Sequence, residues 1–125
     1  MAKKLAMVFG IVFVLVGLLG FISNPIVGSM GFFLTDTIHN IVHLLVGVLL
    51  LIGAGMGARS SALWLKIFGV VYLVLFIDGL VQPSLLGFIA ANTADTYLHL
   101  VLGIVLLIAG MSSKGNGMMM DKATM

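Results

Sequence analysis

The stretch "DTIHNIVHLLVGVLLLIGAGM" (residues 36–56) decides the class of fold. From Leu44 to Met56 it contains only apolar residues and glycine. A helix needs about 20 predominantly apolar residues to cross the hydrocarbon core of a bilayer, and this stretch supplies them. It nevertheless begins with two histidines, His39 and His43, which lie four residues apart. The sequence therefore predicts a membrane-spanning helix. The presence of two imidazoles in such a helix requires an explanation.

The composition of the whole chain points the same way. Of its 125 residues, 62% are hydrophobic and 8% are charged, whereas soluble domains carry about 25% charged residues. The chain has no cysteine, which excludes disulfides and thiolate sites. Its net charge is only +2, and no basic patch interleaved with aromatic residues suggests a nucleic-acid partner. The partner that the composition predicts is the lipid bilayer.

Four apolar segments are long enough to span a membrane. Segments rich in glycine, proline, serine and asparagine separate them, and such residues interrupt helices. The predicted fold is therefore all-α, a polytopic four-helix bundle formed by residues 1–111. Residues 112–125 are polar and are expected to form a disordered cytoplasmic tail. The predicted spans are residues 5–22, 37–56, 62–80 and 95–111.

The basic residues predict the orientation of the bundle. With four spans they all fall on one side, which the positive-inside rule assigns to the cytoplasm. The protein is thus expected in the plasma membrane as a multi-pass protein, with both termini cytoplasmic and both long loops outside. The basic residues are Lys3, Lys4, Arg59, Lys66, Lys114 and Lys122.

The chain also contains an internal repeat. "FGIVFVLVGLLG" (residues 9–20) resembles "FGVVYLVLFIDG" (residues 68–79), and "HLLVGVLLLIG" (residues 43–53) resembles "HLVLGIVLLIA" (residues 99–109). The repeat predicts two tandem, pseudo-symmetric helical hairpins, at about residues 5–57 and 62–111. Because each hairpin has two spans, both insert in the same direction, and the pseudo-two-fold axis runs along the membrane normal.

Polar residues correspond in the repeat as well. His43 matches His99, His39 matches Asp95, and Asp36 matches Asn92. Residues four apart share one face of a helix, so spans two and four should present paired polar groups at the same depth. Ionisable groups in a membrane usually face the bundle interior. For Asp36 and Asp95, a role at the helix N-terminus is an alternative to a place in this cluster.

The stretches "DTIHNIVHLLVGVLLL" and "NTADTYLHLVLGIVLLIAG" resemble a family of small prokaryotic four-span membrane proteins catalogued as a domain of unknown function. The resemblance implies a four-helix membrane bundle without an assigned activity. It transfers no catalytic residue. A weaker similarity of architecture links the chain to the DoxX-like group, some of whose members accompany redox complexes.

Three interpretations of the polar cluster stay open at this point. The first is a hydrogen-bonded network that fixes how the hairpins pack. The second is a divalent metal site, Zn²⁺ or similar, because imidazoles and carboxylates on facing bundle helices suit such ions. The third is haem b held between His43 and His99. The metal interpretation uses His39, His43, Asp95 and His99.

The function classes follow from these interpretations. The sequence favours a non-enzymatic protein that assembles with itself or serves as an accessory subunit of a larger complex, with a metal- or haem-binding protein as the alternative. A transporter is disfavoured, because spans two and four are apolar beyond His43 and His99. No nucleophile with a base at a defined spacing supports catalysis. A glycine stripe on span one, formed by Gly10, Gly17 and Gly20, is expected to pack either inside the bundle or against another subunit.

Overall fold

In the part of the chain that it describes, the computed structural model consists of four helices and two very short strands. The helices are α1 (Ala2–Leu19), α2 (Thr37–Gly55), α3 (Ala58–Val81) and α4 (Thr93–Thr124), and the strands are β1 (Val27–Gly28) and β2 (Phe33–Leu34). The structure describes residues 1–82 and 84–124, with side chains described for residues 1–82 and 84–111. The tail expected for residues 112–125 lies outside the described side chains, and its disorder stays a prediction.

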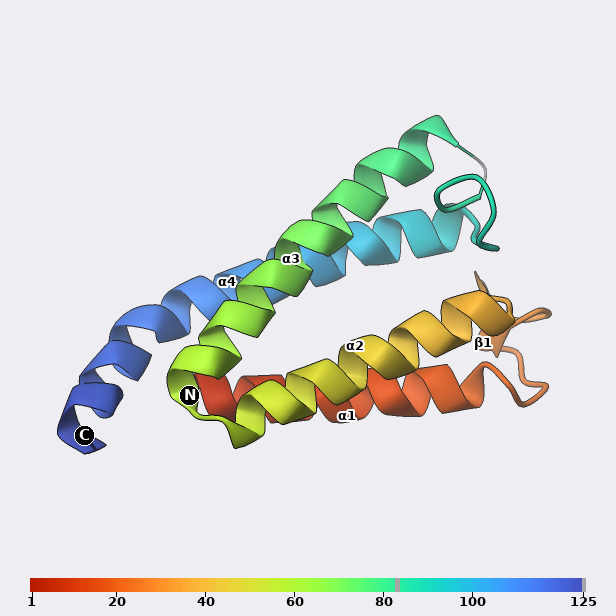
Figure 1. Cartoon of the computed structure of the whole chain (residues 1–125). Coiled ribbons are helices and arrows are strands. Elements are labelled where there is room, and N and C mark those ends of the chain that lie inside the picture. The colour runs from red at the N-terminus through yellow and green to blue at the C-terminus, as the bar shows by residue number, and fades with distance from the viewer. Residues whose placement is uncertain (83, 125) are drawn as a thin grey trace.

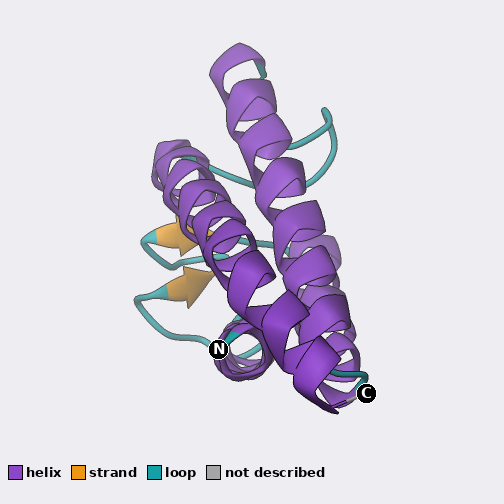
Figure 2. Cartoon of the chain, turned by 90° about the vertical axis from the view of Figure 1, so that its left-hand side faces the viewer, coloured by secondary structure: helices purple, strands orange, loops and turns teal. Residues whose placement is uncertain are grey.

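The helices form two antiparallel hairpins. Helix α1 packs along α2, and α3 packs along α4, with smaller contacts between the hairpins. The N-terminus and the α2–α3 turn lie at one end of the bundle, here called the turn end, and the two long loops lie at the other, here called the loop end (Figure 1). The hairpins diverge toward the loop end, where β1 and β2 pair in parallel in the α1–α2 loop (Figure 2). The predicted all-α bundle is confirmed.

All four helices are long and apolar enough to cross a membrane, α4 through its segment Thr93–Met111. Their outward faces carry large apolar side chains such as Leu15, Val74 and Val101, each more than half exposed. A soluble protein rarely exposes so much contiguous apolar surface, whereas lipid tails solvate it readily. The chain is therefore a polytopic membrane protein.

The helix ends differ from the predicted spans by a few residues, for local reasons. Helix α1 stops at Leu19 rather than at residue 22, because the Asn24 side chain donates to the Leu19 carbonyl and folds the chain away. Gly57 makes the α2–α3 turn with a φ of 115°, a conformation that glycine adopts at little cost. Helix α3 can therefore begin at Ala58 rather than at residue 62.

Glycines bring the two helices of each hairpin into close contact. A Cβ atom on Gly10 would lie 3.0 Å from the Gly47 carbonyl oxygen, and one on Gly47 would lie 2.7 Å from the Gly10 carbonyl oxygen. In the second hairpin, Cβ atoms on Gly69 and Gly103 would lie 2.7 Å and 2.9 Å from backbone nitrogens of the facing helix. Small residues let membrane helices gain packing energy without a hydrophobic driving force.

This packing decides between the two expectations for the glycine stripe on span one. Gly10 faces Leu51, Gly17 faces Leu44, and Gly20 faces Asn40, all on α2 or at its start. The stripe therefore packs inside the bundle and is not the surface on which another subunit would dock. The tandem repeat itself stays a prediction, as does the homo-oligomer.

Candidate metal site between the hairpins

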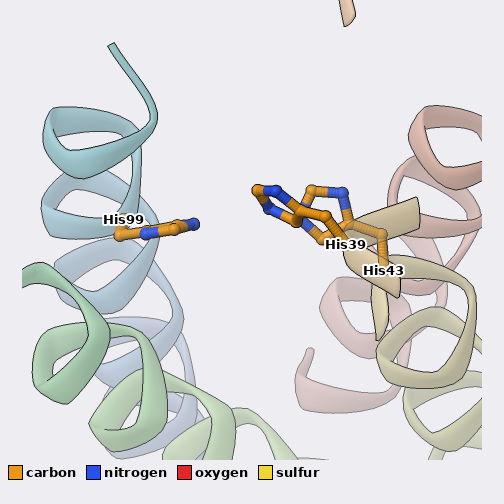
Figure 3. Close-up of side chains that lie close together, drawn as sticks. All are labelled: His39, His43 and His99. Atoms are coloured by element: carbon orange, nitrogen blue, oxygen red, sulfur yellow. The ribbon is translucent and has the colours of Figure 1, made fainter. Parts of the chain in front are cut away.

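Three histidines meet between the hairpins, near the loop end. His39 and His43 lie on the first two turns of α2, and His99 lies on the second turn of α4. Each offers one ring nitrogen, and these nitrogens all lie within 4.8 Å of one another. Figure 3 shows the two imidazoles of α2 pointing across the space between the hairpins toward His99. All three side chains are at most 4% exposed.

The orientation of His39 is fixed by the α3–α4 loop. Its Nδ1 lies 2.7 Å from the Ala90 carbonyl oxygen. A carbonyl can only accept, so Nδ1 carries the proton and Nε2 presents a lone pair. Metal-binding histidines commonly donate their second ring N–H to a carbonyl in this way, which holds the ring and fixes the tautomer.

Each histidine of the cluster has one buried ring nitrogen without a hydrogen-bond partner among the described residues. His39 Nε2, His43 Nδ1 and His99 Nδ1 are buried, and none has a hydrogen-bond partner among the described residues. Buried polar atoms are nearly always paired, because leaving one unpaired costs about 1–3 kcal/mol. Three such atoms in one cluster of imidazoles make it a candidate metal site.

Aromatic rings support the imidazoles on the side of the turn end. Phe13 contacts His43 edge-on with ring centroids 5.9 Å apart, and Tyr72 lies against His99 at 5.3 Å. Phe13 and Tyr72 also stack on each other at 5.5 Å. Packed aromatic neighbours restrict the rotamers of the histidines, so the ring positions are set by the core.

A cavity of about 200 Å³ adjoins the histidines. Apart from the three imidazoles and Tyr72, its walls are apolar, and they come from α2, α3 and the α3–α4 loop: Val42, Val71, Leu75, Leu85, Leu86 and Ile89. The Tyr72 hydroxyl is buried and has no partner among the described residues. The surface that the cavity exposes beside the histidines is thus almost wholly apolar.

Asp95, the fourth predicted metal ligand, is not brought into this group of nitrogens. Its carboxylate accepts from the Asn92 backbone N–H at 2.9 Å, while the Asn92 side chain accepts from the Asp95 backbone N–H at 3.0 Å. This reciprocal pair is a capping box at the start of α4. It uses Asp95 to satisfy backbone groups, which is the helix-end role that the sequence offered as an alternative.

Asp36 caps α2 and also ties the two loops together. One carboxylate oxygen accepts from the His39 backbone N–H at 2.9 Å, and the other accepts from the Ala90 N–H at 3.2 Å. Burial opposes ionisation of Asp36, but these hydrogen bonds outweigh it and hold the pKa of the carboxyl below its ordinary value. Asp36 thereby positions Ala90, whose carbonyl orients His39.

Sequence reasoning did not single out Tyr72 as a residue of the site. The only available signal was its correspondence to Phe13 in the predicted repeat, where a single hydroxyl distinguishes the two. Asp78 is not part of the cluster. It accepts from the Leu86 backbone N–H at 2.8 Å and from the Gln82 side chain at 2.6 Å, and so anchors the α3–α4 loop over the cavity.

The geometry suits a small ion better than haem. Ligand nitrogens on a tetrahedral Zn²⁺ lie about 3.3 Å apart when each Zn–N bond is about 2.0–2.1 Å, so small side-chain rotations would bring the three histidines into range. Haem would need far more room than this cavity offers, since even drug-sized ligands occupy pockets of about 300–1,000 Å³. His39 also stands beside both His43 and His99, with ring centroids 4.6 Å and 6.0 Å away.

Fold and site together define a class of protein: a four-helix membrane bundle with a buried three-histidine cluster between its hairpins. Residues 3–112 match the family described as "Domain of unknown function (DUF4383)", and the chain belongs to this family. No curated protein and no solved structure matches the chain.

Proposed function

We propose that this protein is a metal-binding membrane protein that holds a divalent transition-metal ion, Zn²⁺ or similar, with His39, His43 and His99. The observation that carries the proposal is the convergence of three buried imidazoles, each of which has a buried ring nitrogen without a hydrogen-bond partner among the described residues. Imidazole suits Zn²⁺ and its neighbours in the first transition series. Three protein ligands also leave one tetrahedral position open, as in zinc sites that exchange water or substrate.

The structural interpretation, a hydrogen-bonded network, accounts for less of what is observed. It requires that each buried polar atom have a partner within the bundle. Asp36, Asp95 and Asn92 do pair, but they pair with backbone groups and with each other around the helix starts. One buried ring nitrogen of each histidine remains outside that network among the described residues. A metal ion would account for the convergence of the three imidazoles.

Metal analysis of the purified protein tests the proposal. We expect one equivalent of bound metal in wild-type protein and a visible absorption spectrum typical of tetrahedral Co²⁺ after cobalt substitution. Single changes of His39, His43 or His99 to alanine should each abolish stoichiometric binding. The matched control is Asp95→Asn, which keeps an acceptor for the Asn92 N–H and should bind normally. Wild-type protein that takes up no Co²⁺ or Zn²⁺ would overturn the proposal.

We also propose that the turn end of the bundle, with both termini, is cytoplasmic and that the site lies in the outer half of the plasma membrane. Support comes from the basic residues, which lie near the termini, at the start of α3 and, for Lys66, in the first half of α3. Because the protein has no cysteine, single cysteines report topology cleanly. In intact cells, Ser29→Cys should react with a membrane-impermeant thiol reagent and Ser60→Cys should not; the reverse pattern would refute this orientation.

Assembly, as a homo-oligomer or as a subunit of a larger membrane complex, remains a separate proposal. The α1 glycine stripe no longer supports it, since that stripe packs on α2. Light scattering of the protein in several mild detergents measures it directly. A strict monomer in all of them would exclude a stable homo-oligomer and would leave the metal proposal untouched.

A further inference from the structure

A separate cleft, of about 360 Å³, lies at the loop end of the bundle, between the end of α3 and the start of α4. Gly79 of α3 lies directly against Thr96 of α4, and both residues line the cleft. The apolar spans of these helices end at this level, α3 at Val81 and α4 at Thr93. In a bundle that crosses the bilayer, the cleft therefore lies at the boundary between hydrocarbon and water, where lipids place their headgroups.

The lining of this cleft combines uncharged polar side chains with apolar surface. No charged side chain among the described residues lines it, and it exposes polar and apolar surface in similar measure. The cavity beside the histidines differs, because the surface that it exposes is almost wholly apolar. A molecule that enters the cleft can therefore contact polar atoms directly. The polar side chains of the lining are those of Gln82, Asn92, Thr93, Thr96 and Tyr97.

Three of these side chains have hydrogen-bonding capacity that the described residues do not use. Gln82 donates through Nε2 to the Asp78 carboxylate at 2.6 Å, and its Oε1 accepts from no described residue. The hydroxyls of Thr93 and Tyr97 likewise have no partner among the described residues. An amide oxygen accepts, and a hydroxyl both donates and accepts. The unused groups therefore complement the hydroxyl groups of a ligand, which also donate and accept.

Apolar surface continues from the cleft toward the centre of the membrane. Tyr97 is 56% exposed, and its ring lies near that of Phe76, with centroids 6.4 Å apart. Leu80 lines the cleft and Ile77 lies about one turn further into the span, and they are 60% and 59% exposed. Tyrosine is enriched at this depth of a membrane protein. A molecule with its polar part in the cleft thus finds an apolar helix face for acyl chains.

We propose that the cleft binds a lipid whose headgroup is an uncharged sugar. A sugar ring offers several hydroxyls and no charge, as the lining requires, and the acyl chains cover the apolar face beside it. An ionised headgroup would lose hydration in a cleft whose described side chains hold no opposite charge. The volume lies at the lower end of the range for small-molecule sites, about 300–1,000 Å³, and suits a headgroup of a single ring. This proposal does not depend on the metal site.

Native mass spectrometry of the full chain tests the proposal with three lipids that share the same dioleoyl chains. Monoglucosyl-dioleoylglycerol carries the uncharged sugar, dioleoylphosphatidylglycerol carries hydroxyls and a negative charge, and dioleoylphosphatidylethanolamine carries both signs of charge. The glucolipid should bind at least about tenfold more tightly than either phospholipid. The protein is kept in a polyoxyethylene detergent, because the sugar headgroup of a maltoside would compete for the cleft.

Two nearly isosteric variants locate the site. Thr93→Val/Tyr97→Phe removes two hydroxyls and keeps the shape of the cleft, so glucolipid binding should weaken by about tenfold, the effect of losing two hydrogen bonds. Thr37→Val is the matched control. Thr37 lines a cleft of about 310 Å³ at the corresponding place in the first hairpin, whose lining includes the Asp36 carboxylate. The control should bind the glucolipid as tightly as the wild-type protein does.

The outcomes decide the proposal. Selective binding of the glucolipid that survives in Thr37→Val and weakens in Thr93→Val/Tyr97→Phe is the result expected. No binding of the glucolipid, equal affinity for the three lipids, or tighter binding of a phospholipid would overturn the proposal, and so would equal behaviour of the two variants. None of the substituted residues belongs to the three-histidine cluster, so a result against the glucolipid would leave the metal proposal untouched.

Discussion

The two hairpins of the bundle are built alike and used differently. In both, a glycine on one helix lets the facing helix approach to backbone contact, as Gly47 does toward α1 and Gly103 toward α3. In both, one aromatic ring supports one histidine: Phe13 contacts His43, and Tyr72 contacts His99.

The chemistry differs at the starts of the second helices, α2 and α4. Asp36 and Asn92 are the capping residues, and each accepts from the backbone N–H three residues later. In α4 that third residue is Asp95, whose carboxylate returns to the cap. In α2 it is His39, whose ring instead turns to Ala90 and to the other histidines. The third residue after the cap thus caps the helix in the second hairpin and belongs to the histidine cluster in the first.

The difference shows how two hairpins with similar packing can enclose a candidate site between them. Packing demands are the same in both halves, so the glycines and aromatic rings correspond. The first hairpin has a second imidazole, His39, at the third residue after its cap. The second hairpin has Asp95 at the corresponding place, and Asp95 stabilises the start of α4. The first hairpin contributes two of the proposed metal ligands, and the second contributes one.

The largest expected effect comes from making the first hairpin resemble the second. His39→Asp removes one imidazole, and we expect metal affinity to fall by about 100-fold or more, since loss of even an outer-shell partner costs 10–100-fold. Competition with a chromophoric chelator measures the change. Asp95→Asn should alter affinity less than about twofold. If both variants lose binding equally, Asp95 is a ligand, as the sequence first indicated.

Changes at the glycines test whether the two halves pack with equal stringency. Gly47→Ala and Gly103→Ala should each lower the free energy of unfolding by about 1–3 kcal/mol, because the added Cβ meets backbone atoms within 2.9 Å and overpacking has this cost. Gly55→Ala is the control, because no atom outside its own helix lies within 4 Å of the added Cβ. Thermal unfolding in detergent measures all three, and a Gly47→Ala variant as stable as Gly55→Ala would contradict the packing described here.

Changes at the N-caps of α2 and α4 should have smaller effects on the free energy of unfolding, and the effect at Asp36 should depend on pH. Asp36→Ala should cost about 1 kcal/mol, typical of losing an N-cap, and Asn92→Ala a similar amount. The pKa of Asp36 is lowered on folding, so its stabilisation is complete above the pKa of the unfolded chain, about 3.9, and is lost as the pH falls through the lower folded value. Wild-type stability should therefore fall in that acidic window more than the stability of Asp36→Asn, and parallel pH profiles would refute this role.

The smallest effect is expected where the hairpins differ by one hydroxyl. Tyr72→Phe turns the Phe13–Tyr72 stack into a pair of phenylalanines. In metal-free protein the variant should be as stable as wild type or more stable by up to about 1 kcal/mol, because the buried hydroxyl has no partner among the described residues. Thermal unfolding of the two proteins decides this, and a loss above that size would show that the hydroxyl is paired in the native protein.

The sequence by itself determined the fold class and the helices. An apolar run of about 20 residues favours a helix in lipid, because a helix satisfies its own backbone groups. Residues 37–56 and the three other predicted spans are such runs. The sequence also determined which residues were candidates, because histidines four apart share a helix face and an apolar span makes them costly.

Only the tertiary structure decided which candidates meet. A carboxylate at the start of a helix can cap the helix or turn to a neighbouring group, and sequence spacing is the same in both cases. Asp95 caps because Asn92 offers it a backbone N–H, whereas His39 is drawn inward by the Ala90 carbonyl of a loop 51 residues away. The place of the α1 glycines was likewise open until α2 was seen to lie on them. Such contacts join residues far apart in the chain, and their energies depend on how the two hairpins come together.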